Sequence, residues 1–159
     1  MYKFREATED DFQGIGNLMT SKEELFYIYP HGEYPFTVEQ LTKLAEVRTE
    51  LTVVTEGDDI IGFANLYDHE PGELAFIGNV VVAKQHRGKG VGKEIILHML
   101  RIAFEKLKLP EVRISVFNEN TPAMLLYAGL GFVPYDVGER TDVNNKKVAL
   151  VHMKIVRKA

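Results

Sequence analysis

The sequence contains no cysteine. The chain therefore cannot form a disulfide, a thiolate zinc site or a cysteine nucleophile. Long hydrophobic runs are also missing, because the longest, such as residues 79–83, have only the length of a strand. The N-terminal residues lack the basic segment followed by an apolar segment that marks a secretion signal. We therefore expect a cytoplasmic protein with no membrane partner.

Extremes of composition are absent as well. With 159 residues, 45% of them hydrophobic and 26% charged, the chain has the average composition of a globular domain, which excludes disordered, collagen-like and coiled-coil proteins. No linker rich in proline, glycine and serine, no low-complexity stretch and no repeat divides it. We predict a single domain spanning residues 1–159, long enough to remove roughly 70% of its unfolded surface from water.

Positive charge is scarce overall but concentrated in one place. The formal net charge of −4 argues against a nucleic-acid partner. Four of the 19 Lys and Arg residues nevertheless fall within residues 84–93, a stretch without an acidic residue. A solvated helix face is the ordinary explanation of such a cluster, and a phosphate site is the alternative.

Hydrophobic periodicity and turn residues outline the order of the secondary structure. The patterns predict strands at residues 2–5, 51–55, 60–66, 74–83, 112–117, 132–135 and 148–156, and helices near residues 12–18, 38–48, 88–109 and 121–130. Thr37 and Gln40 have the spacing of a helix-capping box, and Gly131 stands where a left-handed helix cap belongs. This order favours a mixed sheet covered by helices and excludes a bundle or a solenoid.

A basic, glycine-rich turn at residues 84–93 joins one of these strands to the longest helix. The first N–H groups of a helix have no intrahelical partner and carry partial positive charge, so they bind anions where glycines let a ligand approach. The spacing is not that of a P-loop, because Arg87 and Glu94 stand where that motif needs Gly and Ser or Thr. A dinucleotide turn is also disfavoured, because Lys93 replaces its third glycine. The simplest alternative is a turn whose glycines only relieve backbone strain.

The hexapeptide Gln85-His86-Arg87-Gly88-Lys89-Gly90 matches the pattern Gln/Arg-x-x-Gly-x-Gly/Ala. It resembles the turn with which the GNAT superfamily of acyl-CoA-dependent N-acyltransferases holds the pyrophosphate of coenzyme A. A second stretch, residues 120–132, resembles the C-terminal helix and cap of the same family. The resemblance covers nearly the whole chain. It implies an α/β (α+β) fold, with a mixed, mostly antiparallel, central sheet of about seven strands flanked by about four helices.

The activity implied by the resemblance is transfer of an acetyl group from acetyl-CoA, as co-substrate, to a primary amine. The amine attacks directly, with no metal and no covalent enzyme intermediate. A small-molecule amine and a protein amine both remain open as acceptor, and so does the preferred acyl group. A non-catalytic acyl-CoA-binding sensor or interaction module is the alternative function. The closing strands can pair within one subunit or between two, so a homodimer is open as well.

The resemblance also assigns site residues. It places the pantetheine arm of the cofactor beside Val80, Val81 and Val82 and near Asn120, with the main chain of Val81 and Val82 at the thioester oxygen. The pyrophosphate is assigned to the turn; its cofactor-binding residues are Arg87, Gly88, Lys89, Gly90, Val91, Gly92 and Lys93. Tyr127 occupies the position of a catalytic tyrosine that contacts the cofactor and donates to the leaving sulfur, although a tyrosine in such a helix is usually part of the core.

The sequence does not identify a general base. Residues 74–79, where many members of the family carry a glutamate, contain no carboxylate. Asn79 can only orient a water molecule. For His69, Glu73 and Glu33 a solvent-exposed position is the simpler explanation.

Residues 26–36 are rich in aromatic side chains. They include Phe26, Tyr27, Tyr29, Tyr34 and Phe36, together with His31 and Glu33. The resemblance implies that this region lines the acceptor site, where rings and acids could hold a cationic amine. The alternative is that the rings cover the sheet as part of the core.

Overall fold

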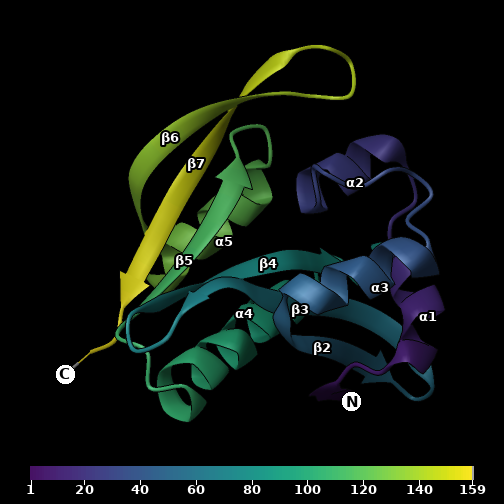
Figure 1. The fold of residues 1–159 in the computed structure, drawn as a ribbon, viewed down its shortest axis with the longest axis horizontal. Helices are drawn as coiled ribbons and strands as arrows, with labels where there is room; N and C mark the ends of the chain where they lie inside the picture. The colour runs from purple at the N-terminus through teal and green to yellow at the C-terminus, as the bar shows by residue number, and fades with distance from the viewer. Residues whose placement is uncertain (159) are drawn as a thin grey trace.

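The computed structural model describes residues 1–158, which build a seven-stranded sheet. The strands are β1 (Tyr2–Glu6), β2 (Thr49–Glu56), β3 (Asp59–Glu70), β4 (Leu74–Val82), β5 (Glu111–Phe117), β6 (Val133–Thr141) and β7 (Lys147–Val156). Their order in the sheet is β1-β2-β3-β4-β5-β7-β6, and all neighbours are antiparallel except β4 and β5. The predicted mixed, mostly antiparallel sheet of seven strands is confirmed (Figure 1).

Five α-helices accompany the sheet, one more than the sequence patterns indicated. They are α1 (Phe12–Gly16), α2 (Lys22–Ile28), α3 (Val38–Val47), α4 (Val91–Arg101) and α5 (Thr121–Leu130). The additional helix is α2, which begins after Ser21, where the Glu24 N–H donates to the Ser21 Oγ at 3.1 Å. Because α2 has only 7 residues, it is too short for hydrophobic periodicity to reveal it. The Ser-x-x-Glu capping spacing was the available signal.

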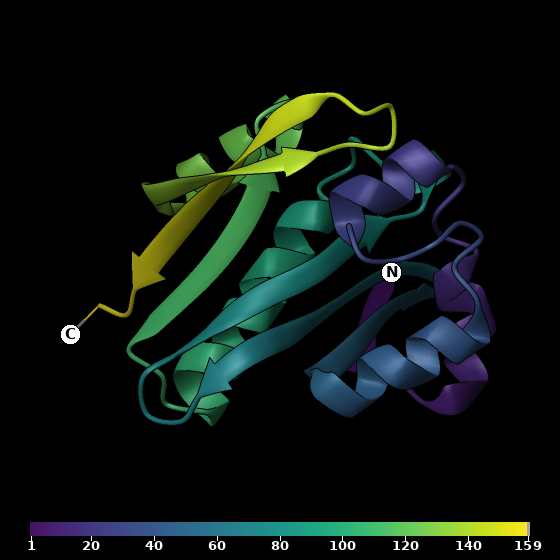
Figure 2. The ribbon, with the colours of Figure 1, turned by 45° about the horizontal axis from the view of Figure 1, so that its top comes forward.

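Helices cover both faces of the sheet, with α4 and α5 on one side and α1, α2 and α3 on the other (Figures 1 and 2). Successive residues of β2 show the two layers, because side chains alternate along a strand. Val54 belongs to the core cluster of α4 and α5, which contains Ile96 and Met99. Val53 belongs to the cluster of α1 and α3, which contains Ile15 and Leu41.

Local signals at the helix ends are confirmed in the structure. At the start of α3 the Gln40 N–H donates to the Thr37 Oγ1 at 3.3 Å, which is one half of the predicted capping box. The other half is not formed, because the Gln40 Oε1 accepts from the Glu33 N–H at 2.8 Å. Gly131 ends α5 in the left-handed conformation, with a φ of 108°. Helix α4 ends at Arg101, earlier than expected, and continues as a π-helical turn, Ile102–Lys106. None of the helices that the structure describes has the length and apolar character needed to cross a membrane.

The two parallel strands at the centre of the sheet separate along their length. β4 and β5 pair from Leu74 and Glu111 to Ile77 and Ile114, where the ladder stops. Two residues later, Asn79 has a φ of 52°, and the register of β4 against β3 shifts at this point. A bulge of this kind bends its strand. The second half of β4 therefore diverges from β5, and one of its main-chain edges has no strand beside it.

Candidate active site

The turn before α4 presents a row of unsatisfied main-chain donors. Gly88 and Gly90 adopt positive φ values of 75° and 85°, which few residues other than glycine tolerate. Within residues 1–158, the N–H groups from 88 to 93 have no hydrogen-bond acceptor. A Cβ atom added to Gly88 or Gly90 would meet no heavy atom within 4 Å. The donors therefore face open space at a helix N-terminus, which suits an anionic ligand.

The basic side chains of the turn divide into two groups. The Arg87 Nε donates to the Val82 carbonyl at 3.0 Å, and its Nη2 lies 3.0 Å from a carboxylate oxygen of Glu24 in α2. Arg87 thus ties the turn to β4 and α2. Lys89 and Lys93 are exposed and form no ion pair with any residue in the described part of the chain. These two ammonium groups are available to a phosphate.

The free edge of β4 follows from the alternation of its hydrogen bonds. The Ala83 N–H donates to the Ile61 carbonyl of β3 at 2.8 Å, and Val81 lies opposite Phe63 of β3. Because main-chain groups of an antiparallel strand point alternately to its two sides, those of Val80 and Val82 face the gap. Arg87 binding to the Val82 carbonyl agrees with this orientation. Of the three predicted valines, Val81 directs its main chain toward β3.

Tyr127 lies in α5 with only 6% of its surface exposed, and it belongs to the core cluster. Its ring is 6.0 Å from that of Phe132. It also lines the cavity beside the gap. Burial raises the pKa of the Tyr127 hydroxyl well above its usual value, so the group stays protonated and keeps a hydrogen that it can donate to a ligand.

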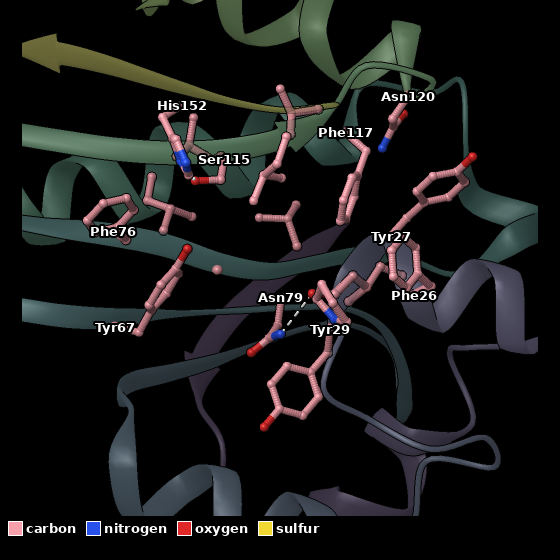
Figure 3. Close-up of a pocket in the computed structure, with 18 of the residues that line it drawn as sticks. Phe26, Tyr27, Tyr29, Tyr67, Phe76, Asn79, Ser115, Phe117, Asn120 and His152 are labelled. Atoms are coloured by element: carbon pink, nitrogen blue, oxygen red, sulfur yellow. Dashed lines mark hydrogen bonds between the residues drawn. The ribbon is translucent and has the colours of Figure 1, made fainter. Parts of the chain in front are cut away.

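Asn120 caps α5, since the Ala123 N–H donates to its Oδ1 at 3.4 Å. The residue also lines the cavity, at the end of β5 (Figure 3). Its oxygen is thus engaged in the helix cap. The amide nitrogen of the side chain has no acceptor among residues 1–158 and is the part that can contact a ligand.

A cavity of about 530 Å³ lies on the α2 side of the gap. Its walls come from α2, β3, β4, β5, α5, β6 and β7; they include Val80, Tyr127 and, labelled in Figure 3, Phe26, Tyr67, Phe76, Ser115, Phe117 and His152. Tyr127 and Asn120 reach it from α5, on the other face of the sheet. The gap between β4 and β5 therefore connects the glycine turn with this cavity.

A chain of buried polar groups holds the bulge of β4 in place. An Arg48 Nη1 donates to the Asn65 Oδ1 at 3.1 Å, and the Asn65 Nδ2 donates to the Asn79 Oδ1 at 2.7 Å. The Asn79 Nδ2 then donates to the carbonyl of Ile28, the last residue of α2, at 2.9 Å (Figure 3). Both ends of the Asn79 side chain are engaged in this way. Its position explains the bulge and the docking of α2 better than it explains the orientation of a water molecule.

Ser115 and His152 form a polar pair that the sequence did not reveal. The Ser115 Oγ lies 2.6 Å from the His152 Nδ1, and the Tyr67 hydroxyl points toward them (Figure 3). The two residues are 37 positions apart and become neighbours only because β5 and β7 pair in this register. No local spacing could have indicated the contact. The pair faces the cavity, where an imidazole can accept a proton.

The aromatic residues of the 26–36 region fall into two groups: some line the cavity and others lie away from it. Phe26, Tyr27, Tyr29 and His31 line the cavity. Phe36 instead is buried in the α1 and α3 core, and the exposed Tyr34 donates to the Thr20 carbonyl at 3.1 Å. None of the three candidate bases from the sequence lies among the described residues that line this cavity: His69, Glu73 and Glu33.

Sequence and structure comparisons point to one family. The sequence model of the acetyltransferase (GNAT) family matches residues 13–132. A spermine/spermidine N(1)-acetyltransferase of Bacillus subtilis is 26% identical over 149 residues, which cover 89% of this chain and 92% of that protein. The streptothricin acetyltransferase of Streptomyces lavendulae is 33% identical over 88 residues, covering 55% of this chain and 46% of that protein. Several of the matched relatives are thus spanned over less than half of their length.

Solved structures show the same fold. The spermidine N-acetyltransferase of Vibrio cholerae, in complex with CoA and spermine, superimposes with a TM-score of 0.83 at 23% identity, covering 98% of this chain and 95% of that one. A putative phosphinothricin N-acetyltransferase superimposes with a TM-score of 0.85 at 19% identity, over 100% of both chains. Because both identities are below 25%, these two structures show only that the fold is shared.

Proposed function

Because this chain belongs to the GNAT acetyltransferase family, we propose that it transfers an acetyl group from acetyl-CoA to a primary amine. The observation that carries the proposal is the row of open N–H groups from 88 to 93, which leads along the free edge of β4 to the cavity. One end of this path suits a diphosphate, and the other end can hold a small molecule.

The residues present fit coenzyme A. The open N–H groups of the turn and the ammonium groups of Lys89 and Lys93 are donors for a pyrophosphate. The edge groups of Val80 and Val82 can pair with the amides of a pantetheine arm, as an added strand would. Acetyl-CoA, when bound, supplies the activated thioester.

Two donors would act on the charges that develop during transfer. The main-chain N–H of Val80 or Val82 stabilises the oxyanion that forms on the thioester carbonyl. The Tyr127 hydroxyl donates a hydrogen bond to the departing sulfur. With reference pKa values of about 10 for tyrosine and about 8.5 for a thiol, full proton transfer is uphill by ~2 kcal/mol. Because burial raises the pKa of Tyr127 further, hydrogen bonding is the role we assign to it.

Ser115 and His152 are our candidates for removing the proton of the amine. A primary amine with a pKa near 10.4 is neutral in only about one molecule in 10³ at pH 7. The Ser115 hydroxyl, 2.6 Å from the His152 Nδ1, can donate to that nitrogen while its oxygen accepts from the amine or a bridging water. The proton then ends on the imidazole, which later releases it to solvent.

The cavity favours a small acceptor over a lysine on a folded protein, because it is walled by side chains from seven helices and strands. A cytoplasmic location and a homodimer stay predictions from the sequence.

Calorimetry with CoA, acetyl-CoA and ATP, followed by a thiol-release assay with an amine library, tests this function. We expect CoA and acetyl-CoA to bind far more tightly than ATP, and at least one amine to release thiol from acetyl-CoA. Tight CoA binding with no thiol release by any amine would favour the non-catalytic sensor. No CoA binding would refute the proposal.

A further inference from the structure

Arg48, which follows α3, places a guanidinium in the wall of the cavity. Its Cζ lies 4.2 Å from the centre of the Tyr67 ring and 5.3 Å from that of Tyr29. A Cβ atom at Gly78 would lie 2.4 Å from the Arg48 Nη1 and 2.6 Å from the Tyr67 ring. Glycine at position 78 therefore makes room for the guanidinium beside β4, directly before the bulge.

This guanidinium has no carboxylate partner. Arg5 pairs with Asp11 at 2.8 Å and Arg87 with Glu24 at 3.0 Å, but no acidic residue within residues 1–158 pairs with Arg48. Burial lowers the pKa of Arg48, and the more weakly acting charge of Asp68 opposes that shift. An arginine stays charged under such conditions. The cavity wall thus contains a half-buried cation whose single side-chain hydrogen bond within residues 1–158 goes to the neutral Asn65.

The cavity as a whole has a positive rather than a negative character. Asp68 is the one acidic side chain among its described lining residues, and it is exposed. Arg140 adds a second guanidinium to the lining. A polyamine would bring several positive charges next to Arg48, which like-charge repulsion opposes. A half-buried cation without a counter-ion, such as Arg48, is instead stabilised by an anion that arrives with the ligand.

We infer that the acceptor is an amine that also carries a carboxylate, and that Arg48 binds this carboxylate. The planar fork of a guanidinium matches a carboxylate with two parallel hydrogen bonds. The rings of Tyr29 and Tyr67 and the bond to Asn65 fix the orientation of the fork. This inference rests on the proposed acetyl transfer, because it names the class of amine that the same site accepts.

Matched acceptors test the inference. Thiol release is measured with amino acids, with the amines that remain when their carboxylate is removed, with aminoalkyl phosphinates and with spermidine. We expect kcat/KM for the best amino acid to exceed that of its decarboxylated amine by about tenfold or more, and spermidine to be poor. Preference for the phosphinate over the carboxylate would overturn the carboxylate assignment, and preference for decarboxylated amines or spermidine would overturn the anionic acceptor altogether.

Substitutions of Arg48 test whether this residue causes the preference for amines that carry a carboxylate. Arg48→Met retains the apolar stem, and it is expected to lose the tenfold preference through a higher KM for the amino acid. The KM for the decarboxylated amine should change much less, which separates loss of the carboxylate contact from any displacement of the Asn65 and Asn79 side chains. Arg48→Lys keeps the charge without the fork and should retain part of the preference. The exposed Arg101→Met is the matched control and should behave as the wild type. An unchanged preference in Arg48→Met would refute the role of Arg48.

The two proposals fail in distinguishable ways. If an amine lacking a carboxylate is acetylated best, the acetyl transfer stands and the Arg48 inference falls. If no amine releases thiol, the proposed function falls. The Arg48 site is then tested by calorimetry, which measures how tightly amino acids bind to the CoA-bound protein. Binding to the wild type that is lost in Arg48→Met would support the site. Equal binding to both proteins, or binding to neither, would refute it.

Discussion

The two ends of the gap between β4 and β5 offer a ligand different groups: main-chain groups at one end and side chains at the other. The glycine turn offers main-chain N–H groups contributed by consecutive residues, from 88 to 93. The cavity at the other end is lined by side chains from α2, β3, β4, β5, α5, β6, β7 and the residue after α3. The first end can serve any ligand with a diphosphate, because peptide groups are the same in every sequence. The second end depends on which side chains the fold brings together, and it therefore determines the acceptor.

Tyr127 lies between the two ends, and its removal should have the largest effect. We expect Tyr127→Phe to lower kcat by roughly 10²-fold with little change in the CoA affinity, because the ring keeps its packing against Phe132 and only the donor to the sulfur is lost. Steady-state kinetics with calorimetry checks this, and the exposed Tyr34→Phe is the control. An unchanged kcat would leave Tyr127 a core residue.

On the cavity side, His152→Gln should lower kcat/KM by about 30-fold at pH 7, somewhat less than the roughly 10²-fold at which general base catalysis usually begins, because water can still take up part of the protons. The loss should shrink as the pH rises toward 9, because the acceptor amine then loses its proton without help. A purely structural defect would persist at every pH. His69→Gln, outside the cavity, is the matched control, and a loss there instead would return the base to the position considered from the sequence.

On the turn side, Gly90→Ala should weaken CoA binding by about tenfold and leave the acceptor preference unchanged. Its Cβ would occupy open space beside the turn, where no heavy atom lies within 4 Å, and its φ of 85° would strain an alanine by about 1–2 kcal/mol. Gly57→Ala is the matched control. Gly57 lies between β2 and β3, outside the turn, and it has a similar φ of 60° with no heavy atom within 4 Å of an added Cβ, so its substitution introduces the same backbone strain. Equal effects of the two substitutions on CoA affinity would show that strain alone is responsible.

A substitution at the Arg5 and Asp11 ion pair should change the stability of the fold but neither the CoA affinity nor the acceptor preference. Asp11 is 7% exposed and accepts two hydrogen bonds of 2.8 Å from Arg5, which holds the pKa of the Asp11 carboxyl below its usual range. Asp11→Asn should cost about 1–2 kcal/mol of folding free energy near pH 7 without altering the CoA affinity. Because the folded-state pKa is depressed, this stability is present above about pH 4 and is lost as the pH falls through the folded pKa. Chemical denaturation at pH 7 and in acid measures it, and a difference that persists in acid would contradict the ion-pair explanation.

The contrast between the two ends also explains what the sequence could predict. The glycine turn and α4 are continuous in the chain, so the motif at residues 85–90 and the helix pattern after it indicate both the element and its ligand class. The strands and their mixed arrangement follow from alternation and from the order of the elements. Only the short α2 escaped the periodic signal.

The acceptor cavity was beyond the reach of local patterns. Ser115 and His152 meet through strand register, and Arg48 acquires its role from a glycine on β4 and two tyrosines on other elements. Each of these residues looks ordinary in its own segment. A polar side chain on a strand is normally solvent-facing, and an arginine at a helix end is normally a surface charge. Tertiary packing alone turns them into a site.

A titration of the ¹⁵N-labelled protein with CoA, followed by NMR, would show whether the cofactor lies along the turn and β4. We expect the largest amide shifts at the turn, at Gly88, Gly90 and Gly92, and along the free edge of β4 at Val80 and Val82, with the opposite edge strand β1 unaffected. If CoA binds but leaves the amides of the turn and of β4 unchanged, the main-chain path from the turn to the cavity is refuted.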